Sequence, residues 1–218
     1  MGAAIGDILP LAVGVAISPI PIVAVILMLL SRNARTTSAG FGLGWLVGIL
    51  AVTGIVILLA GSITPDDGDG ASTGWVKVVL GLLLIFLAFK QWQSRSDTAP
   101  PKWMQAIDEF TFVKATGLGL VLSAVNPKNL LLCVSAGVAI GTAGLSSGNA
   151  IVVWLVFTVL AVCSVLVPVI GYAVATERLA SPLDATKTWL QANNHVVMAI
   201  VLLIMGAVVL GKGLGGLQ

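Results

Sequence analysis

The chain has 218 residues, of which 58% are hydrophobic and only 9% are charged, and its formal net charge at pH 7 is +2. With a mean hydropathy of +1.08, it is too apolar for a soluble globular protein, in which about half of the residues are apolar and about a quarter are charged. The small net charge gives no reason to expect a nucleic-acid partner. We therefore expect an all-α, polytopic integral membrane protein.

Six apolar stretches are long enough to cross a bilayer, since a transmembrane helix needs roughly 20 mainly apolar residues. They cover about 5–30, 38–61, 75–93, 115–141, 148–174 and 195–212. The first stretch lacks a basic leader and a cleavage site, so we expect it to be retained as a helix. The loops are too short for a soluble catalytic domain, and any activity must lie within or between the helices.

The first expected span carries Ser18, Pro19 and Pro21 near its centre, in the run SPIP. Proline lacks an N–H group and clashes with the carbonyl one turn back, so backbone groups lose their helical partners. In hydrocarbon such groups are costly unless protein, water or ligand satisfies them. The sequence predicts a broken helix here, with an ordinary proline kink as the alternative. Upstream, Asp7 with Pro10 indicates the start of this helix.

The second expected span carries glycine at every fourth position, at Gly40, Gly44 and Gly48. This spacing of small residues lets two membrane helices approach closely. It favours either packing inside the monomer or a homodimer face, and the sequence leaves both open.

Two segments on the predicted cytoplasmic side look like short amphipathic or capped helices. In the linker 94–114, Trp103, Ile107 and Phe110 would share one apolar face, which suits a helix lying in the membrane interface. Farther along, Ser181 and Pro182 resemble an N-cap followed by a first-turn proline. Anchoring in the interface and gating of a cytoplasmic entrance are both compatible with these patterns.

The fourth expected span carries the run Asn126, Pro127, Lys128 and Asn129 near its centre. A charge at bilayer depth costs roughly 2.5–3.5 kcal/mol on insertion scales, and such charges usually face a cavity, a partner or a substrate. All nine acidic residues of the chain fall in loops or at helix ends under this assignment. We therefore expect the missing partner of Lys128 to be an anionic head group such as phosphate, sulfate or carboxylate.

Two further features bear on the Lys128 prediction. The exposed N-termini of the half-helices would add positive dipole ends that favour an anion. As an alternative, Lys128 pairs only with backbone carbonyls or extends its stem to interfacial water.

The two proline clusters fall at matching places, which suggests a duplicated half. Each half would be one broken helix followed by two further helices, in residues 1–93 and 115–218, joined by the linker 94–114. Because three spans are an odd number, the second copy must be inverted in the membrane. Inverted repeats with interrupted helices are typical of transporters whose substrate site lies near the midplane.

The basic residues predict the orientation, because cytoplasmic loops carry an excess of lysine and arginine. With the first loop in the cytoplasm, the outer side receives only Lys77 and Lys212. The cytoplasmic side then receives Arg32, Arg35, Lys90, Arg95, Lys102, Lys114, Arg178 and Lys187. Both termini are therefore predicted to lie outside the cytoplasm.

Several kinds of chemistry have no support in the sequence. There is no phosphate-binding GxxxxGK[ST] loop and no cluster of histidine, cysteine and carboxylate with metal-ligand spacing. The two cysteines, Cys133 and Cys163, are isolated and are expected to pack as small hydrophobic residues. We expect no catalytic residue, no metal and no cofactor, and hence no enzyme.

The six spans in two halves and the two proline motifs resemble the GAP-like, or sulfolipid-addressing protein, family of the LysE-like superfamily of exporters. The resemblance covers essentially the whole chain. It implies an actinobacterial plasma (inner) membrane protein that helps move glycolipids toward the cell envelope. It also implies that the motif residues contribute to the substrate site: Ser18, Pro19, Pro21, Asn126, Pro127, Lys128 and Asn129.

Three functions are consistent with these patterns. The preferred one is a transporter or flippase in which Lys128 holds the head group of an anionic glycolipid while the acyl tails stay in the bilayer. The second is an exporter of a small solute, such as an amino acid or ion. The third is an accessory that moves nothing itself and docks on a larger lipid exporter.

Overall fold

The structure is a computed structural model that describes residues 1–63, 70–96 and 102–217. Helices make up 91% of it, and no described residue lies in a strand. The elements in chain order are α1 (Gly2–Ala16), α2 (Pro19–Leu29), α3 (Ala34–Ile63), α4 (Gly70–Gln93), η1 (Ser94–Ser96), η2 (Lys102–Glu109), α5 (Phe112–Ala124), α6 (Pro127–Gly141) and α7 (Ser147–Gly215).

Four segments of the described chain are long and apolar enough to cross a membrane as single helices: Ala34–Gly61, Thr73–Ser96, Ser147–Val174 and Ser181–Gly215. Two further candidates are bent pairs, α1 with α2 at 51° and α5 with α6 at 62°. The breaks fall at the two predicted proline motifs. The structure therefore has four to six candidate spans, and the multi-pass, all-helical class is confirmed.

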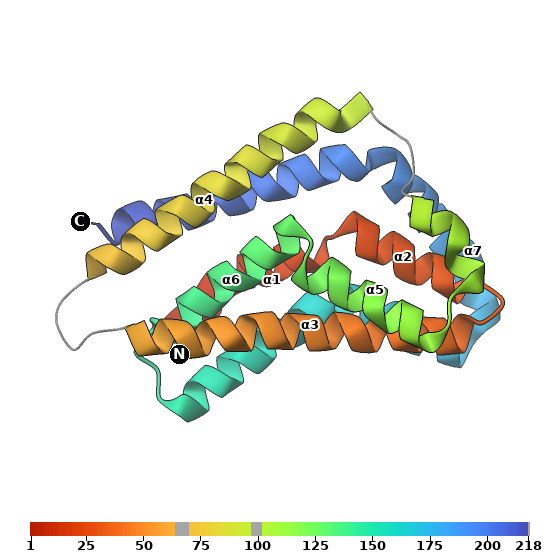
Figure 1. The fold of residues 1–218 in the computed structure, drawn as a ribbon, viewed down its shortest axis with the longest axis horizontal. Helices are drawn as coiled ribbons and strands as arrows, with labels where there is room; N and C mark the ends of the chain where they lie inside the picture. The colour runs from red at the N-terminus through yellow and green to blue at the C-terminus, as the bar shows by residue number, and fades with distance from the viewer. Residues whose placement is uncertain (64–69, 97–101, 218) are drawn as a thin grey trace.

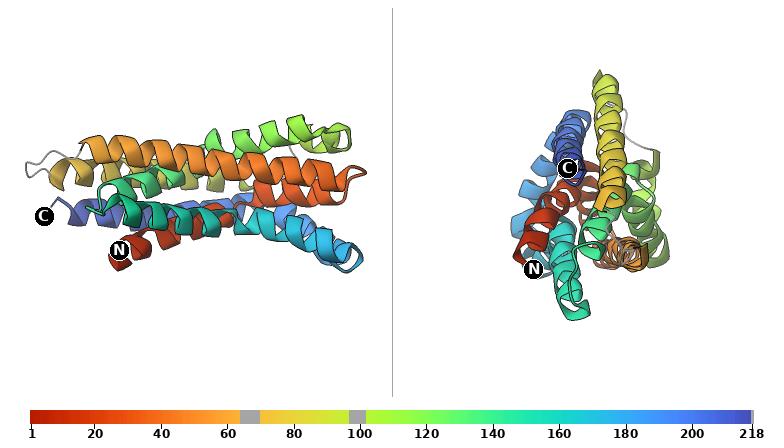
Figure 2. Two further views of the ribbon diagram at one scale, coloured as in Figure 1. Left: turned by 90° about the horizontal axis from the view of Figure 1, so that it is seen from below. Right: turned by 90° about the vertical axis from the view of Figure 1, so that its left-hand side faces the viewer.

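The helices run roughly along one long axis, and α7 doubles back between its two candidate spans (Figures 1 and 2). The marked N- and C-terminal ends lie at the same end of the molecule, opposite to this reversal (Figure 2). The returning half of α7 lies along α4, and α3 lies along α5 (Figure 1). These two pairs share the most extensive packing in the molecule.

The outer surface of the bundle is apolar. Leu58 is 73% exposed, Phe86 is 62% exposed and Val159 is 65% exposed. In water such a surface would mark an aggregation-prone or binding patch. Spread over the candidate spans, it is what a protein in contact with hydrocarbon requires.

The glycines of α3 pack against α5 within the monomer. A Cβ atom at Gly44 would lie 2.0 Å from the carbonyl oxygen of Thr116, and one at Gly48 would lie 1.9 Å from Oγ of Ser123. Gly119 of α5 returns the contact, since its Cβ would lie 2.4 Å from the carbonyl oxygen of Phe41. The glycine spacing thus serves packing inside the monomer. A homodimer stays a prediction, and the glycine face of α3 does not support it.

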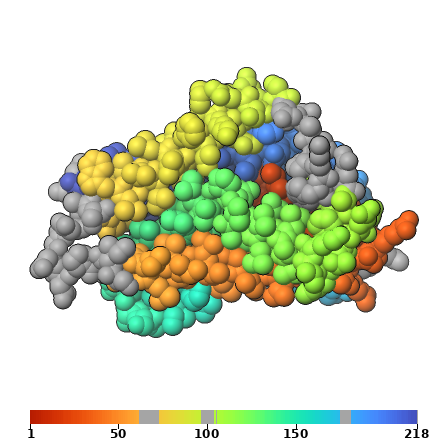
Figure 3. All heavy atoms as spheres, viewed as in Figure 1, coloured from red at the N-terminus to blue at the C-terminus, as the bar shows by residue number. Residues whose placement is uncertain are grey.

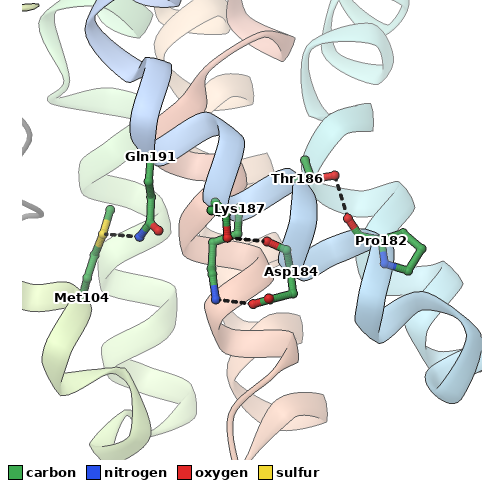
Figure 4. A network of polar contacts seen from close by, with 7 residues as sticks. Met104, Pro182, Asp184, Thr186, Lys187 and Gln191 are labelled. Carbon is green, nitrogen blue, oxygen red and sulfur yellow. Dashed lines mark hydrogen bonds and ion pairs between the residues drawn. The ribbon is translucent and has the colours of Figure 1, made fainter.

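Two predicted helix starts are wrong. The first helix begins at Gly2 and contains Pro10 in its interior, so the segment around Asp7 is no helix start. Pro182 also lies inside a helix, because the backbone of α7 stays helical through the reversal and its N-cap is Ser146. Near the reversal, Thr186 donates a hydrogen bond to the carbonyl of Pro182, and Lys187 pairs with Asp184 (Figure 4).

The predicted linker contains the short 3₁₀ helix η2, and α5 already begins at Phe112, inside the predicted linker. The side chain of Ile107 is buried, and that of Phe110 packs against the core. These two residues of the apolar face therefore pack onto the protein, with η2 next to α2, whereas the side chain of Trp103 lies outside the described residues. The location of this face in the membrane interface stays a prediction.

Candidate functional site at the two helix breaks

The two helix breaks meet in the interior of the molecule through side chains that lie 110 residues or more apart in sequence. The Lys128 amine donates hydrogen bonds to Oγ of Ser18 at 2.9 Å and to the carbonyl oxygen of Ile17 at 3.1 Å. Ser18 Oγ in turn donates to Oδ1 of Asn129 at 2.8 Å. Oγ of Ser18, in the first break, therefore bonds to both the Lys128 amine and the Asn129 amide of the second break.

The first break exposes a carbonyl because of where its proline stands. In a continuous helix the Ile17 carbonyl would accept from the N–H four residues later, and that residue is Pro21, which has none. Pro21 occupies the first turn of α2, where its missing N–H costs the helix nothing. The Ile17 carbonyl is left free, and the Lys128 amine takes the place of the absent donor.

The second break is closed by the two asparagines of its motif. Asn126 is the N-cap of α6, and its Oδ1 accepts from the backbone N–H of Lys128 at 3.1 Å. Asn129 donates its side-chain N–H to the carbonyl oxygen of Leu122, near the end of α5, at 2.9 Å. Both are the kind of substitute partner that a broken helix needs in hydrocarbon. The two asparagine side chains thus satisfy backbone groups that the break leaves without helical partners.

Lys128 nevertheless has no carboxylate partner among the described residues. Its side chain is buried, and the residue is only 2% exposed. The described chain contains two ion pairs, Lys187 with Asp184 and Lys212 with Asp7, and neither involves it. The C-terminal end of α1 offers a favourable partial charge at Ile17, whereas the N-terminus of α6, on which Lys128 stands, is unfavourable to a cation.

The structure places the seven predicted residues unequally. Ser18, Lys128 and Asn129 form the bonded centre and are at most 2% exposed. Asn126 acts through the backbone of α6, Pro19 and Pro21 are buried in the first turn of α2, and Pro127 is exposed. The site is closed in this structure. The alternative in which Lys128 extends its stem to interfacial water is wrong, because the residue is buried. The alternative in which it pairs only with backbone carbonyls is incomplete, because the hydroxyl of Ser18 also accepts from the amine.

Sequence reasoning missed the two backbone carbonyls at Ile17 and Leu122. The first has a readable signal, because a proline four residues after any helical residue removes that residue's hydrogen-bond donor. The second has none, since the Leu122 carbonyl is released by the bend and then met by Asn129 from the next helix. Such a contact depends on the angle between α5 and α6.

A second charged cluster lies where α1, α4, α6 and α7 converge. Lys212 donates to Oδ1 of Asp7 at 2.7 Å, and both side chains are partly exposed. Asp7, Lys77 and Lys212 line a small cavity of about 20 Å³, with Ser135 on its wall. This volume holds no more than a water molecule, so the cluster joins helix ends rather than forming an open site.

A family profile described as Sap, sulfolipid-1-addressing protein, matches residues 8–215, which is nearly the whole chain. No curated protein and no solved structure matches. The match includes both helix breaks and every residue of the buried polar centre.

Proposed function

This chain belongs to the sulfolipid-1-addressing protein family, and on that premise we propose that it transports an anionic lipid, with Lys128 as the residue that holds the head group. The family description points to a role in sulfolipid addressing. Beyond this role, we propose that the protein itself transports or flips an anionic glycolipid. Such transport needs neither a cofactor nor a covalent step, and we propose no enzymatic activity.

The observation that carries the proposal is the buried Lys128 amine, which has no carboxylate partner in the part of the chain that the structure describes. An apolar residue at this position would be more stable, because a lysine charge at bilayer depth costs roughly 2.5–3.5 kcal/mol. A sulfate or phosphate group would supply the missing charge. Each hydrogen bond to a charged group contributes roughly 1.5–3 kcal/mol, so two such bonds to a bound anion would offset the cost.

The bonding at the breaks suggests how binding would proceed. In the closed state the Lys128 amine is occupied by Ser18 and by the carbonyl of Ile17. An incoming anion would replace these two weak acceptors with charged oxygens. The hydroxyl of Ser18 would then be free to donate to the anion, while Asn129 keeps α5 and α6 joined through Leu122.

The architecture supports a transporter with two interrupted helices. We propose that the two bent pairs count as single spans, which gives six spans arranged as two inverted repeats of the LysE-like type. In this arrangement the breaks lie near the midplane, where transporters with discontinuous helices bind substrate. We further propose that the protein lies in the plasma membrane with both termini outside the cytoplasm, following the distribution of basic residues.

The experiment is a flipping assay on purified protein in vesicles. The probe is sulfatide, a sulfated glycolipid, with an NBD fluorophore that dithionite bleaches only in the outer leaflet. We expect the wild type to expose inner-leaflet probe to bleaching, and Lys128→Gln to slow this by about 10- to 150-fold, the equivalent of the roughly 1.5–3 kcal/mol of a charged hydrogen bond. Lys128→Arg should keep part of the activity.

Lys114→Gln is the matched control, because Lys114 is an exposed lysine at the start of α5 and lies outside the buried centre. It should behave as wild type. Equal rates for wild type and Lys128→Gln would refute the assigned role of Lys128. If the wild type moves no lipid but releases an encapsulated amino acid, the small-solute exporter is favoured; if it moves neither, the accessory role is favoured.

A further inference from the structure

A long apolar groove separates α3 from the first part of α7. Its volume is about 950 Å³, at the upper end of the roughly 300–1,000 Å³ usual for small-molecule pockets. One wall is α3 and the other is the start of α7, which lie side by side on one face of the molecule (Figure 3). The last turn of α6, at Ile140 and Gly141, also lines it.

None of the described residues that line the groove is charged. The polar side-chain groups among these described residues are the hydroxyl of Ser147 and the indole of Trp154. Glycines hollow it out, since Gly54 lies against the ring of Trp154, where a Cβ would come within 2.8 Å of the ring. The described lining of the groove therefore offers mainly shape and apolar contact.

The level of the groove is fixed by the α3–α5 packing. Its inner end is at Val47, next to Gly48, which packs on Ser123 just before the second break. Its outer end on α3 is Gly61, about 21 Å away along the helix at 1.5 Å per residue. One leaflet of hydrocarbon is about 15 Å thick, so the groove is long enough for an acyl chain that spans a leaflet.

We propose that this groove binds one acyl chain of a membrane lipid. The rims of the groove face outward, with Ile55 58% exposed and Ile151 52% exposed, so the groove opens sideways into hydrocarbon. In that medium a chain enters through close packing rather than through the hydrophobic effect. As the tail site of the transported lipid, the groove rests on the proposed function; the binding of a chain is tested separately.

The test uses Trp154 as the reporter, because bromine atoms on an acyl chain quench a tryptophan that they touch. The purified protein is placed in phosphatidylcholine vesicles with and without chains brominated at carbons 9 and 10. The contribution of Trp154 is the fluorescence lost in the variant Trp154→Phe. Ala51→Phe fills the groove from an exposed position on α3, and Ala207→Phe is the matched control at an exposed position elsewhere.

We expect bromine to quench Trp154 in the wild type and in Ala207→Phe, and at least twofold less in Ala51→Phe. Quenching that is unchanged by Ala51→Phe, or absent in the wild type, would overturn the proposal. If Ala51→Phe does not fold, Ile151→Trp measured by lipid adducts in native mass spectrometry fills the groove from the opposite wall. A shift of the filled variant from dimer to monomer, with no lipid adduct in the wild type, would instead assign the groove to a second copy of the chain.

The outcomes separate this proposal from the transport function. Lys128→Gln leaves the groove intact and should be quenched as wild type is. If Trp154 is quenched and Ala51→Phe relieves the quenching while the wild type moves no sulfatide, the chain site stands and the transport function fails.

Discussion

The close packing of α3 on α5 can be tested by adding a single methyl group at Gly44. The new Cβ would lie 2.0 Å from the Thr116 carbonyl oxygen and 3.1 Å from the backbone nitrogen of Leu120, whereas ordinary van der Waals contact begins at 3.4 Å. These obstacles are backbone atoms and cannot rotate away. The variant Gly44→Ala must therefore push the two helices apart.

The size of the effect follows from two opposing terms. Overpacking costs about 1–3 kcal/mol, and alanine gains about 1 kcal/mol over glycine inside a helix. Because the clash is with backbone, we expect a net loss of about 1–2 kcal/mol. At about 2–4 °C per kcal/mol for a chain of this size, the melting temperature should fall by about 2–8 °C.

Gly117→Ala is the matched control, since it lies on the partner helix α5 and a Cβ there meets nothing within 4 Å. It keeps the helix-propensity gain without the clash, and its melting temperature should stay level or rise. The measurement is the loss of the monodisperse size-exclusion peak after heating in mild detergent. If Gly44→Ala melts at or above Gly117→Ala, the two helices are not packed backbone to backbone.

Two further predictions concern the helix breaks. Pro21→Ala restores an N–H that can pair with the Ile17 carbonyl in place of Lys128. We therefore expect a higher melting temperature together with slower sulfatide flipping. Faster flipping would contradict the role of the break. Asn129→Leu leaves the buried carbonyl of Leu122 without its donor, which costs about 1–3 kcal/mol of stability and should lower the melting temperature. A melting temperature equal to that of the wild type would show that the α5–α6 angle does not depend on this bond.

Much of the fold was predictable because it depends on local properties of the chain. Span length follows from the thickness of the bilayer, and a break follows from the missing N–H of proline. The six apolar stretches and the two broken pairs were predicted for these reasons. The helix starts at Asp7 and Ser181 were predicted wrongly because a local rule, that proline marks a helix start, does not hold there. Pro10 and Pro182 lie inside helices.

Lys128 could be singled out as a candidate site residue from the sequence, but its partners could not. A lysine in an apolar segment with no nearby carboxylate is visible in the printed residues. That its amine reaches Ile17 and Ser18 depends on how α1 packs on α6. No local rule gives a contact between residues more than 100 positions apart.

The sequence by itself determined that this is a helical membrane protein with two proline breaks and an isolated lysine in the second of them, because hydrophobicity and backbone geometry act residue by residue. Only the tertiary structure decided that the breaks share one buried polar centre, that the glycines of α3 face α5, and that a groove lies between α3 and α7. These features depend on distances between helices. Such distances are set by the packing of many side chains at once, which the order of residues along the chain does not display.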